Sequence, residues 1–531
     1  MNSITDYDAP ITAETTAAGG AVEQTVPITL TTSLDQYAIP SGPYMVPVSW
    51  RRTHLSTLVN KLVASSSTDS AATTVPFDFI IDSSLLRTSL GEHLDTQGLT
   101  SESTLSIEYV RSTLPPTRLA AFEHDDWVAS VDCGHVGGVG SVYMTSAYDG
   151  SVRLFSPSNA AEAEHTFSTL NKATVQAGKN GSLTSAKWTP KADAIVTGGM
   201  DGRVQLWNVA QGEDGEWTSS RKWVGEAHNA PISAVDTAQG PSGASVLSVG
   251  WDGMVALWDD IPSSSTSDTV VESESEDNSE DEGASKRRKT TNGKSSKSSK
   301  TTPSKPGTQS PTTILWHAQP TSHSITGAKN VFTPSSRITS VLFERSFSSC
   351  SRSSKDANRA WTSGFNGQLK GWDLSSGGFV HTSLSLPTST SSEIRPIISL
   401  THLAPSTLVA GSMDRGIHIF DSRPSTSGVQ TLGIAINNAH KGPVDVVSAH
   451  PIDLHLFASG SGMEGTVKVW DSRSSKKALF SLAVGEQGGN KAEKGVLGLD
   501  WSNDGQELVA GGKDKRITVY RGSNIGGSAE K

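Results

Sequence analysis

The sequence contains little of what secreted, membrane-spanning or cysteine-based zinc proteins require. Only two cysteines, Cys133 and Cys350, occur in 531 residues, which excludes a disulfide framework and a cysteine-rich zinc site and indicates a reducing compartment. The first residues include Asp6 and Asp8 instead of the basic and apolar regions of a signal peptide. No apolar run reaches the roughly 18 residues that a membrane helix needs. We therefore expect neither secretion nor association with a membrane.

Basic charge and catalytic motifs are also scarce. Charged residues make up 18% of the chain, and the net charge is -10. This charge does not favour a protein that coats nucleic acid, because affinity for phosphates grows with the number of Lys and Arg contacts. The sequence has no Walker loop, no G-x-S-x-G elbow and no H-E-x-x-H motif. We therefore expect no enzymatic activity, no small-molecule substrate, and no metal or cofactor bound by this chain alone.

What the sequence does contain is glycine, tryptophan and repetition. Its 50 glycines and 13 tryptophans are typical of a protein with many turns and short strands. From about residue 120 one phrase returns seven times: a small residue, Asp-Gly or its equivalent, and alternating apolar residues that end in an aromatic. Asp-Gly favours a tight hairpin turn, and the alternation predicts a strand with one buried face. The closing aromatics are Phe155, Trp207, Trp258, Trp372, Phe420, Trp470 and Tyr520.

A period of about 50 residues with Trp-Asp or Trp-Asn endings resembles the WD-repeat β-propeller family, which has four short strands in each repeat. In that family a His before the first strand, a Ser or Thr on the second, the turn Asp and the Trp form a buried hydrogen-bonded set. The resemblance implies this structural role for the residues that fit the pattern best, His228, Ser248, Asp252 and Trp258.

A propeller ring requires one strand to close its last blade, because an open ring leaves an unpaired sheet edge. Only eleven residues follow Tyr520, too few for another strand with its turn. The missing strand is therefore expected at Thr117–Phe122, immediately before the first repeat. We predict a mainly β protein with a seven-bladed WD-repeat propeller over residues 113–525.

One gap between closing aromatics, 114 residues from Trp258 to Trp372, exceeds a single repeat. The excess falls at 263–313, where no aromatic occurs and Ser, Thr and charge dominate, so we predict a disordered acidic and basic insert within the propeller. A compact basic cluster in this insert indicates nuclear import or contact with RNA, the alternative being a charge run that only keeps the loop soluble. The cluster consists of Lys286, Arg287, Arg288 and Lys289.

Residues 23–112 form a separate predicted unit after a polar, disordered tail at 1–22. Thr25–Leu30 and Ala38–Trp50 have the composition of strands, and alternating apolar residues predict two more, around Phe79 and Ile107. Between them an i, i+3, i+4, i+7 stripe indicates an amphipathic helix; its residues are Leu55, Leu58, Val59, Leu62 and Val63. The order ββαβ, a leucine-rich segment and a last strand is similar to that of the ubiquitin-like β-grasp domain.

Glu102 lies in the polar segment Gly98–Leu105, at the entry to the last predicted strand of this unit. Taken by itself, it is a solvated carboxylate, as most glutamates are. An exposed carboxylate on a rigid domain is, however, also a suitable oxygen ligand for a Mg²⁺ ion held by another protein, because Mg²⁺ demands oxygen ligands in octahedral geometry.

Two further motifs have simpler explanations. Gly460–Gly465 matches G-x-G-x-x-G, but the strand-like Thr466–Trp470 follows it instead of the helix that a dinucleotide site needs. A propeller turn is therefore expected there. Trp470–Arg473 matches W-D-x-R, which some WD-repeat substrate receptors use to dock on cullin-RING ligase adaptors, but W-D is already part of the repeat.

In combination, these features resemble the YTM family over nearly the whole chain beyond residue 22. The resemblance rests on the seven repeats with a basic insert after the third, on the Glu102 loop, and on four segments: Pro76–Ile81, Leu85–Leu90, Leu114–Pro116 and Asp126–Val128.

Proteins of this family are WD-repeat subunits of the Pescadillo and Bop complex of ribosome biogenesis. The resemblance implies a non-catalytic scaffold that binds a Bop-type WD-repeat protein and a Pescadillo-type protein on the pre-ribosomal particle of the large subunit, for maturation of 5.8S and large-subunit rRNA. It implies that the AAA ATPase midasin binds the ubiquitin-like domain, with Glu102 as ligand to a shared Mg²⁺, and that the protein lies in the nucleus, in nucleolus and nucleoplasm. The alternative is a substrate receptor of a cullin-RING ubiquitin ligase.

Overall fold

The computed structural model describes residues 24–66, 74–137, 140–157, 162–170, 181–240, 243–261, 308–317, 337–346, 355–375, 377–386, 394–423, 432–485 and 494–522. The chain divides into two compact units, Met1–Ser112 and Thr113–Lys531.

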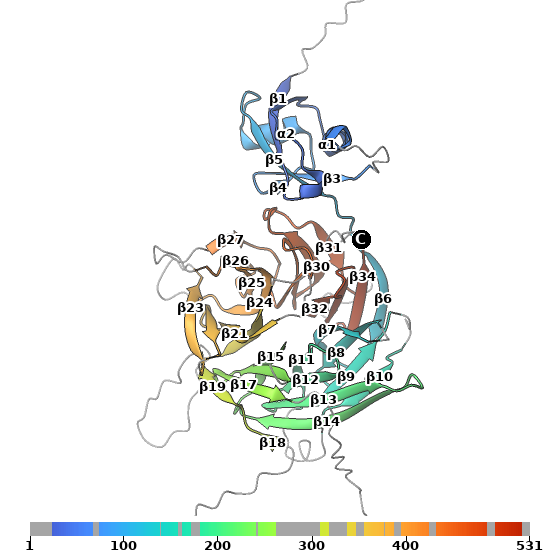
Figure 1. Cartoon of the computed structure of the whole chain (residues 1–531), viewed down its shortest axis with the longest axis vertical. Helices are drawn as coiled ribbons and strands as arrows, with labels where there is room; N and C mark the ends of the chain where they lie inside the picture. Colours follow the sequence, from blue (N-terminus) through green and yellow to red (C-terminus); the bar gives the residue numbers. More distant parts are fainter. Residues whose placement is uncertain are drawn as a thin grey trace, which may run out of the picture. The chain divides into compact units, whose positions relative to one another are not determined.

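The N-terminal unit is a five-stranded mixed sheet with two helices (Figure 1). The strand order is β2-β1-β5-β3-β4, with β1 and β5 parallel and the other neighbours antiparallel. This is the ubiquitin-like β-grasp fold. Its elements are β1 (Thr25–Thr31), the 3-10 turn η1 (Asp35–Tyr37), β2 (Tyr44–Pro47), α1 (Arg52–Ser66), β3 (Phe77–Ile81), β4 (Ser84–Leu85), α2 (Leu90–Gln97) and β5 (Leu105–Arg111).

The predicted apolar stripe forms α1 and faces the core. Leu55 and Val59 are fully buried in the cluster that also contains Phe77, whereas Leu58 is only partly buried. The leucine-rich segment contains a helix of its own, α2. It begins after Ser89, whose hydroxyl accepts the Glu92 N–H, and ends at Gly98 in the left-handed conformation that glycine adopts readily.

The second predicted strand, Ala38–Trp50, is wrong in its extent. Only Tyr44–Pro47 pairs with β1, as strand β2. Pro40 and Pro43 precede it and have no N–H to donate to a sheet, so the chain approaches the strand as irregular backbone.

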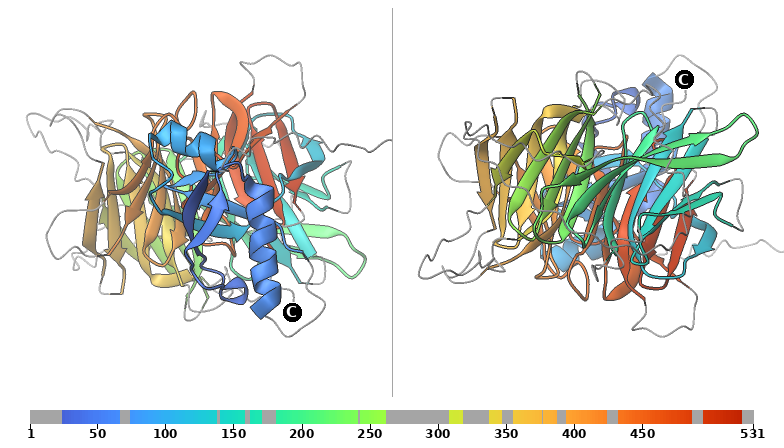
Figure 2. Two further views of the ribbon diagram at one scale, coloured as in Figure 1. Left: turned by 90° about the horizontal axis from the view of Figure 1, so that it is seen from above. Right: turned by 90° about the horizontal axis from the view of Figure 1, so that it is seen from below.

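The C-terminal unit consists of seven sheets, one for each blade (Figures 1 and 2). Blade 1 contains β7 (Val128–Val136), β8 (Gly140–Ala147), β9 (Ser151–Phe155) and β10 (His165–Ser168); blade 2 contains β11 (Leu183–Trp188), β12 (Ala194–Gly199), β13 (Arg203–Gln211) and β14 (Trp217–Glu226). Blade 3 contains β15 (Ile232–Gln239), β16 (Ala244–Gly250), β17 (Met254–Ile261) and β19 (Thr313–Trp316); blade 4 contains β20 (Ile338–Arg345), β21 (Lys355–Gly364), β22 (Gln368–Asp373) and β23 (Phe379–Ser385).

The remaining blades follow the same antiparallel order. Blade 5 contains β24 (Ile397–Ala404), β25 (Thr407–Ser412), β26 (Ile417–Asp421) and β27 (Leu432–Ile436); blade 6 contains β28 (Val446–Ala449), β29 (Leu456–Ser461), β30 (Glu464–Asp471) and β31 (Phe480–Ala483). Blade 7 contains β32 (Val496–Trp501), β33 (Glu507–Gly512), β34 (Arg516–Arg521) and, from the start of the unit, β6 (Thr117–Glu123).

The ring closes through β6, as the sequence predicts. This strand pairs antiparallel with β34, from Glu123 opposite Arg516 to Thr117 opposite Arg521. The inner strands of successive blades contact one another around the ring, and the inner strand of blade 7, β32, contacts that of blade 1, β7. The seven-bladed propeller is therefore complete, and Phe122 of β6 is buried in the last junction.

The insert interrupts blade 3 between its third and fourth strands, β17 and β19. Its predicted end at residue 313 is wrong, because part of this stretch is ordered. Residues Thr308–Gln309 form β18, which pairs in parallel with Val224 and Gly225 at the outer edge of β14, and Thr313 already begins β19. An unpaired strand edge accepts any backbone of suitable register, so the absence of aromatic residues did not reveal this pairing. Residues 262–307 lie outside the described part of the chain.

Candidate functional site

Glu102 lies at the third position of a turn, Thr100–Ser103, that leads into β5. The Ser103 N–H and the Ser103 hydroxyl both donate to the Thr100 carbonyl, at 3.2 and 2.7 Å. Gln24 Nε2, just before β1, donates to the Ser101 hydroxyl at 2.8 Å and connects the turn to the sheet. The Glu102 side chain is exposed. The turn thus presents a carboxylate to solvent from a braced backbone.

A carboxylate in this position has the chemistry to complete the shell of a hard cation that another protein holds. No described side chain forms an ion pair with Glu102, so its oxygens are available for a ligand. Within the described ranges, no three His, Cys, Asp or Glu side chains are grouped so that they could hold a metal ion. Across the same ranges, no helix has the length and apolar character required to span a membrane.

The basic cluster Lys286, Arg287, Arg288 and Lys289 lies outside the described residues, as does the tail at 1–22. Nuclear import therefore stays a prediction from the sequence.

The set expected from the repeat is only partly joined in blade 3. His228 Nε2 contacts the Ser248 hydroxyl at 2.7 Å, and His228 Nδ1 contacts the two Asp252 carboxylate oxygens at 3.2 and 3.1 Å. Trp258 is buried nearby, but its indole N–H has no hydrogen-bond partner among the described residues. Blade 3 therefore connects three members of the set and leaves out the fourth.

Blade 6 has the more complete set, although Glu464 stands there in place of the turn Asp. The Ser459 hydroxyl lies 2.7 Å from His440 Nε2 and accepts the Trp470 indole N–H at 2.8 Å, while His440 Nδ1 contacts Glu464 at 3.0 Å. Burial, with the charge of Lys468, lowers the pKa of His440 to about 4, against the opposing effect of Glu464. The His440 imidazole is therefore uncharged at neutral pH, as expected of a buried side chain with a structural role.

This difference between blades predicts unequal effects of removing the two serine hydroxyls. Ser459→Ala leaves the buried Trp470 N–H without an acceptor, and an unsatisfied buried donor costs about 1–3 kcal/mol. Ser248→Ala removes only the contact to His228. We therefore expect its loss in free energy of unfolding to be about 1 kcal/mol smaller than that of Ser459→Ala. Equilibrium urea unfolding of both variants measures the difference; equal losses would contradict the assignment of Trp470 to Ser459.

The two remaining motifs are used within blade 6. The turn 460–465 joins β29 directly to β30, with no helix to receive a pyrophosphate. In the W-D-x-R segment, Trp470 is buried, and the Arg473 guanidinium pairs with the Asp471 carboxylate at 2.7 Å. Asp471 also accepts the Arg473 N–H at 2.8 Å. The Asp471 and Arg473 side chains of the motif are therefore paired with each other. This pairing does not favour docking on a cullin-RING ligase adaptor.

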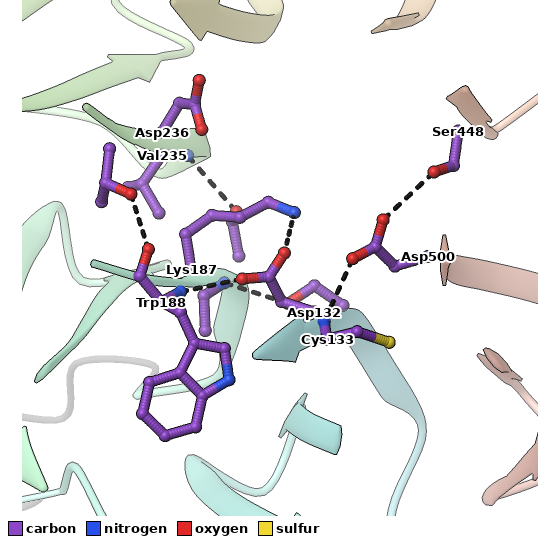
Figure 3. Close-up of polar contacts among 12 residues, drawn as sticks. Asp132, Cys133, Lys187, Trp188, Val235, Asp236, Ser448 and Asp500 are labelled. Atoms are coloured by element: carbon purple, nitrogen blue, oxygen red, sulfur yellow. Dashed lines mark hydrogen bonds and ion pairs between the residues drawn. The ribbon is translucent and has the colours of Figure 1, made fainter. Parts of the chain in front are cut away.

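The inner strands of all seven blades line a central cavity of about 860 Å³. Around it, a side chain at the fifth position of an inner strand accepts a backbone N–H from the next blade (Figure 3). Four of the seven junctions are connected in this way: Asp132 to Trp188 at 2.8 Å, Asp236 to Phe343 at 2.7 Å, Thr401 to Ala449 at 3.2 Å and Asp500 to Cys133 at 3.0 Å. The last of these joins blade 7 to blade 1.

Two lysines compensate the buried charge of these aspartates. Lys187 Nζ lies 2.5 Å from Asp132 (Figure 3), and Lys355 Nζ lies 2.5 Å from Asp236. Burial raises the pKa of Asp132, and Lys187 opposes this effect. Burial alone would lower the pKa of Lys187, but the charges of Asp132, Asp500 and Asp236 outweigh it and raise that pKa. In both pairs a lysine ammonium group faces the aspartate, so the aspartates can serve as strong acceptors of the backbone N–H groups.

These connecting residues were not predicted from the sequence. The available signal was an Asp within an apolar inner strand, as in the segments Ser130–Cys133, Ala234–Thr237 and Gly498–Trp501. A carboxylate in a strand that is otherwise buried requires a partner, and here the neighbouring blade supplies it.

Comparison with known proteins covers both units. Residues 26–94 match the NLE (NUC135) domain, and residues 171–208, 219–259, 433–471 and 485–521 match the WD domain, G-beta repeat. Ribosome biogenesis protein YTM1 of Debaryomyces hansenii is 30% identical over 500 residues, which cover 91% of this chain and 94% of the relative. The protein of that name from Meyerozyma guilliermondii is 30% identical over 509 residues (92% and 94%), and that of Neosartorya fischeri is 28% identical over 559 (99% and 99%).

The similarity to these relatives covers 91 to 99% of this chain. The chain therefore belongs to the YTM1 family of ribosome biogenesis proteins.

Proposed function

We propose that this protein is a non-catalytic assembly factor of the large ribosomal subunit. In this proposal the propeller is a scaffold in a complex with a Bop-type WD-repeat protein and a Pescadillo-type protein, and the complex supports maturation of 5.8S and large-subunit rRNA in the nucleolus and nucleoplasm. The β-grasp unit is the handle by which the AAA ATPase midasin removes the complex from pre-ribosomes. Membership of the YTM1 family supports the role in ribosome biogenesis.

The observation that carries the proposed handle is the Glu102 turn. Its carboxylate is exposed, its backbone is braced at Thr100 and Gln24, and it belongs to a compact unit distinct from the propeller. A braced carboxylate loses little conformational freedom when it becomes a ligand, which favours binding. The Mg²⁺ ion belongs to the adhesion site of the partner and is shared only at the interface.

Affinity purification of the full-length protein under native conditions tests the proposal. We expect Pescadillo-type and Bop-type proteins to be isolated with it in comparable amounts, together with precursors of 5.8S and large-subunit rRNA. Isolation of cullin adaptors in place of these proteins would instead identify a ubiquitin-ligase receptor. Arg473→Ala provides a control, because it should not change the composition of the complex.

Deleting residues 263–306 from the insert should leave the propeller folded, because a longer or shorter loop changes closure entropy only slightly. The deletion retains β18 and β19 and removes Lys286–Lys289, so we expect an unchanged melting temperature and reduced nuclear accumulation. Fluorescence microscopy of the tagged protein measures the second effect. A variant with alanine at the four basic positions is the matched control, and undiminished nuclear localisation of both would exclude the import role.

A further inference from the structure

One residue in each blade immediately precedes the Asp, Asn or Glu of the turn between the second and third strands. Six of these seven residues are aromatic or methionine, and one is lysine. In blade order they are Tyr148, Met200, Trp251, Phe365, Met413, Met463 and Lys513.

A recurrent hydrogen bond places six of these residues at one end of the ring; the N–H of the seventh, Met463, in the equivalent turn of blade 6, donates instead to the Ser461 hydroxyl at 3.3 Å. The Tyr148 N–H donates to the Trp127 carbonyl at 3.0 Å, and the Met413 N–H donates to the Pro396 carbonyl at 2.9 Å. In each case the acceptor lies just before the inner strand of the same blade. Corresponding bonds of 2.8–3.0 Å join Met200 to Ser182, Trp251 to Pro231, Phe365 to Arg337 and Lys513 to Gly495. We call this end of the propeller the turn face.

Apolar side chains are exposed on the turn face. Met463 is 71% exposed, Met413 47% and Trp251 36%. Two more come from the segments that precede inner strands, Ile394 at 56% and Trp127 at 43%. Single exposed apolar residues are normal on a protein surface, but their repetition around one end of a ring marks an interaction surface.

The turn face carries several cations, although the chain has a net charge of -10; exposed acids also lie there, and Asp125 among them is paired with Arg153. The turn acids are engaged within their own turns: Asp252 accepts the Met254 N–H at 3.1 Å, and Asp414 accepts the Gly416 N–H at 2.9 Å. Two cations of the turn face, Arg415 and Lys441, are exposed to solvent.

Two further cations of this face lie against exposed tryptophans. Arg337 Cζ is 4.4 Å from the ring centre of Trp251, and Lys513 Nζ is 5.5 Å from that of Trp127. Trp127 also meets Tyr148 edge to face, with ring centres 6.1 Å apart. Cation–aromatic contacts hold these long side chains in place, so less freedom is lost when a partner's carboxylate pairs with them.

From this arrangement we infer that the turn face is the docking surface for a protein partner whose complementary surface is an apolar patch bordered by Asp and Glu side chains. An apolar centre rich in Trp and Met with Arg at its edge has the anatomy of a protein interface. RNA is a poorer match, because Met413, Met463 and Ile394 offer no aromatic plane on which a base could stack. The inference deepens the scaffold role and rests on the proposed function.

The experiment uses the full-length protein and, as probe, the purified Bop-type WD-repeat domain, with affinity measured by isothermal titration calorimetry. Met463→Asp and Trp251→Ala should each weaken binding by about tenfold or more, as substitutions at the centre of an interface do. Lys513→Glu should weaken binding and reduce its dependence on salt concentration. Ile452→Asp is the matched control: it alters an exposed apolar residue of the same blade, 44% exposed, in the turn between β28 and β29 at the opposite end. It should bind like the wild type.

The outcomes separate the inference from the proposed function. If Met463→Asp and Trp251→Ala both bind the probe with wild-type affinity, the inference is overturned and the scaffold role remains. The same conclusion follows if only Ile452→Asp loses affinity for the probe. No binding of the probe by the wild type would overturn the proposed partner and the inference with it. In parallel, loss of binding to a labelled large-subunit rRNA fragment in Met463→Asp, with binding to the probe retained, would identify RNA as the occupant. Circular dichroism and melting curves exclude misfolding of the variants.

Discussion

Replacing Glu102 by alanine is expected to weaken strongly the Mg²⁺-dependent binding of this protein to the adhesion domain of midasin. The side chain would be the only ligand that this chain contributes to the ion, so its removal leaves the coordination shell incomplete. We expect affinity to fall by on the order of a hundredfold, the scale of a central hot-spot residue. Glu102→Asp keeps the charge but is one methylene shorter, so it should bind poorly as well.

The fold should not change in either variant, because the turn is held by Ser103, Thr100 and Gln24, and not by Glu102. An exposed surface substitution usually alters stability by about 0.5 kcal/mol or less. Asp95→Ala, which removes an exposed carboxylate from the nearby helix α2, is the matched control and should bind normally.

The assay compares binding of the full-length protein to the purified adhesion domain with Mg²⁺ and with a chelator. Wild-type binding that persists with the chelator, or Glu102→Ala binding at full strength, would exclude the metal-ligand role. In cells the Glu102→Ala protein should act dominantly, because its propeller still assembles into the pre-ribosome while its handle no longer engages the ATPase.

Deletion of the closing strand should destabilise the propeller far more than deletion of the β-grasp unit. Removing residues 1–112 ends at the boundary between the units, whereas removing residues 1–123 also takes β6 and exposes the edge of β34. Phe122, only 2% exposed, is lost from its contact with Phe155, whose ring centre is 4.7 Å away. Removal of a buried Phe side chain alone costs about 3–5 kcal/mol.

Thermal melting of the two truncated proteins measures the effect, with a melting temperature close to that of the full chain expected only for the shorter deletion. Point variants in the full chain refine the test. Phe122→Ala should lower the melting temperature strongly, and Leu119→Ala, on the same strand but 46% exposed, should not. Similar melting of both truncations would show that the ring holds together without β6.

The sequence was sufficient for the architecture because each blade repeats its own pattern. Alternating residues such as Val204 and Leu206, followed by a closing aromatic, recur in every repeat, and the closing strand followed from counting the residues after Tyr520. Blades 1 and 4 and the first three strands of blade 5 fall outside the matched WD-domain segments, but their turns and aromatics are enough to identify them. Glu102 was singled out by its loop, and not by its residue type, and its role as a metal ligand stays a prediction.

Contacts between segments distant in the chain could not be predicted in the same way. Whether Trp258 or Trp470 reaches a serine hydroxyl depends on the orientation of a side chain within a filled core. The pairing of Thr308 with Val224 depends on which sheet edge remains free. The connection from Asp500 to Cys133 exists only once the ring is closed. None of these relations leaves a local periodicity in the sequence.

The position of β6 has a mechanical consequence. Only the short link at 113–116 separates the β-grasp unit from the strand that latches the ring. A force applied to the β-grasp unit therefore reaches the propeller at its closing strand, β6, and not at a peripheral loop. While the applied force is smaller than the strength of the β6–β34 hydrogen-bond ladder, the whole propeller moves as one folded body. Above that strength β6 would separate from β34, and the ring would open between its first and last strands. A motor that applied such a force would therefore unfold the propeller as well as move it.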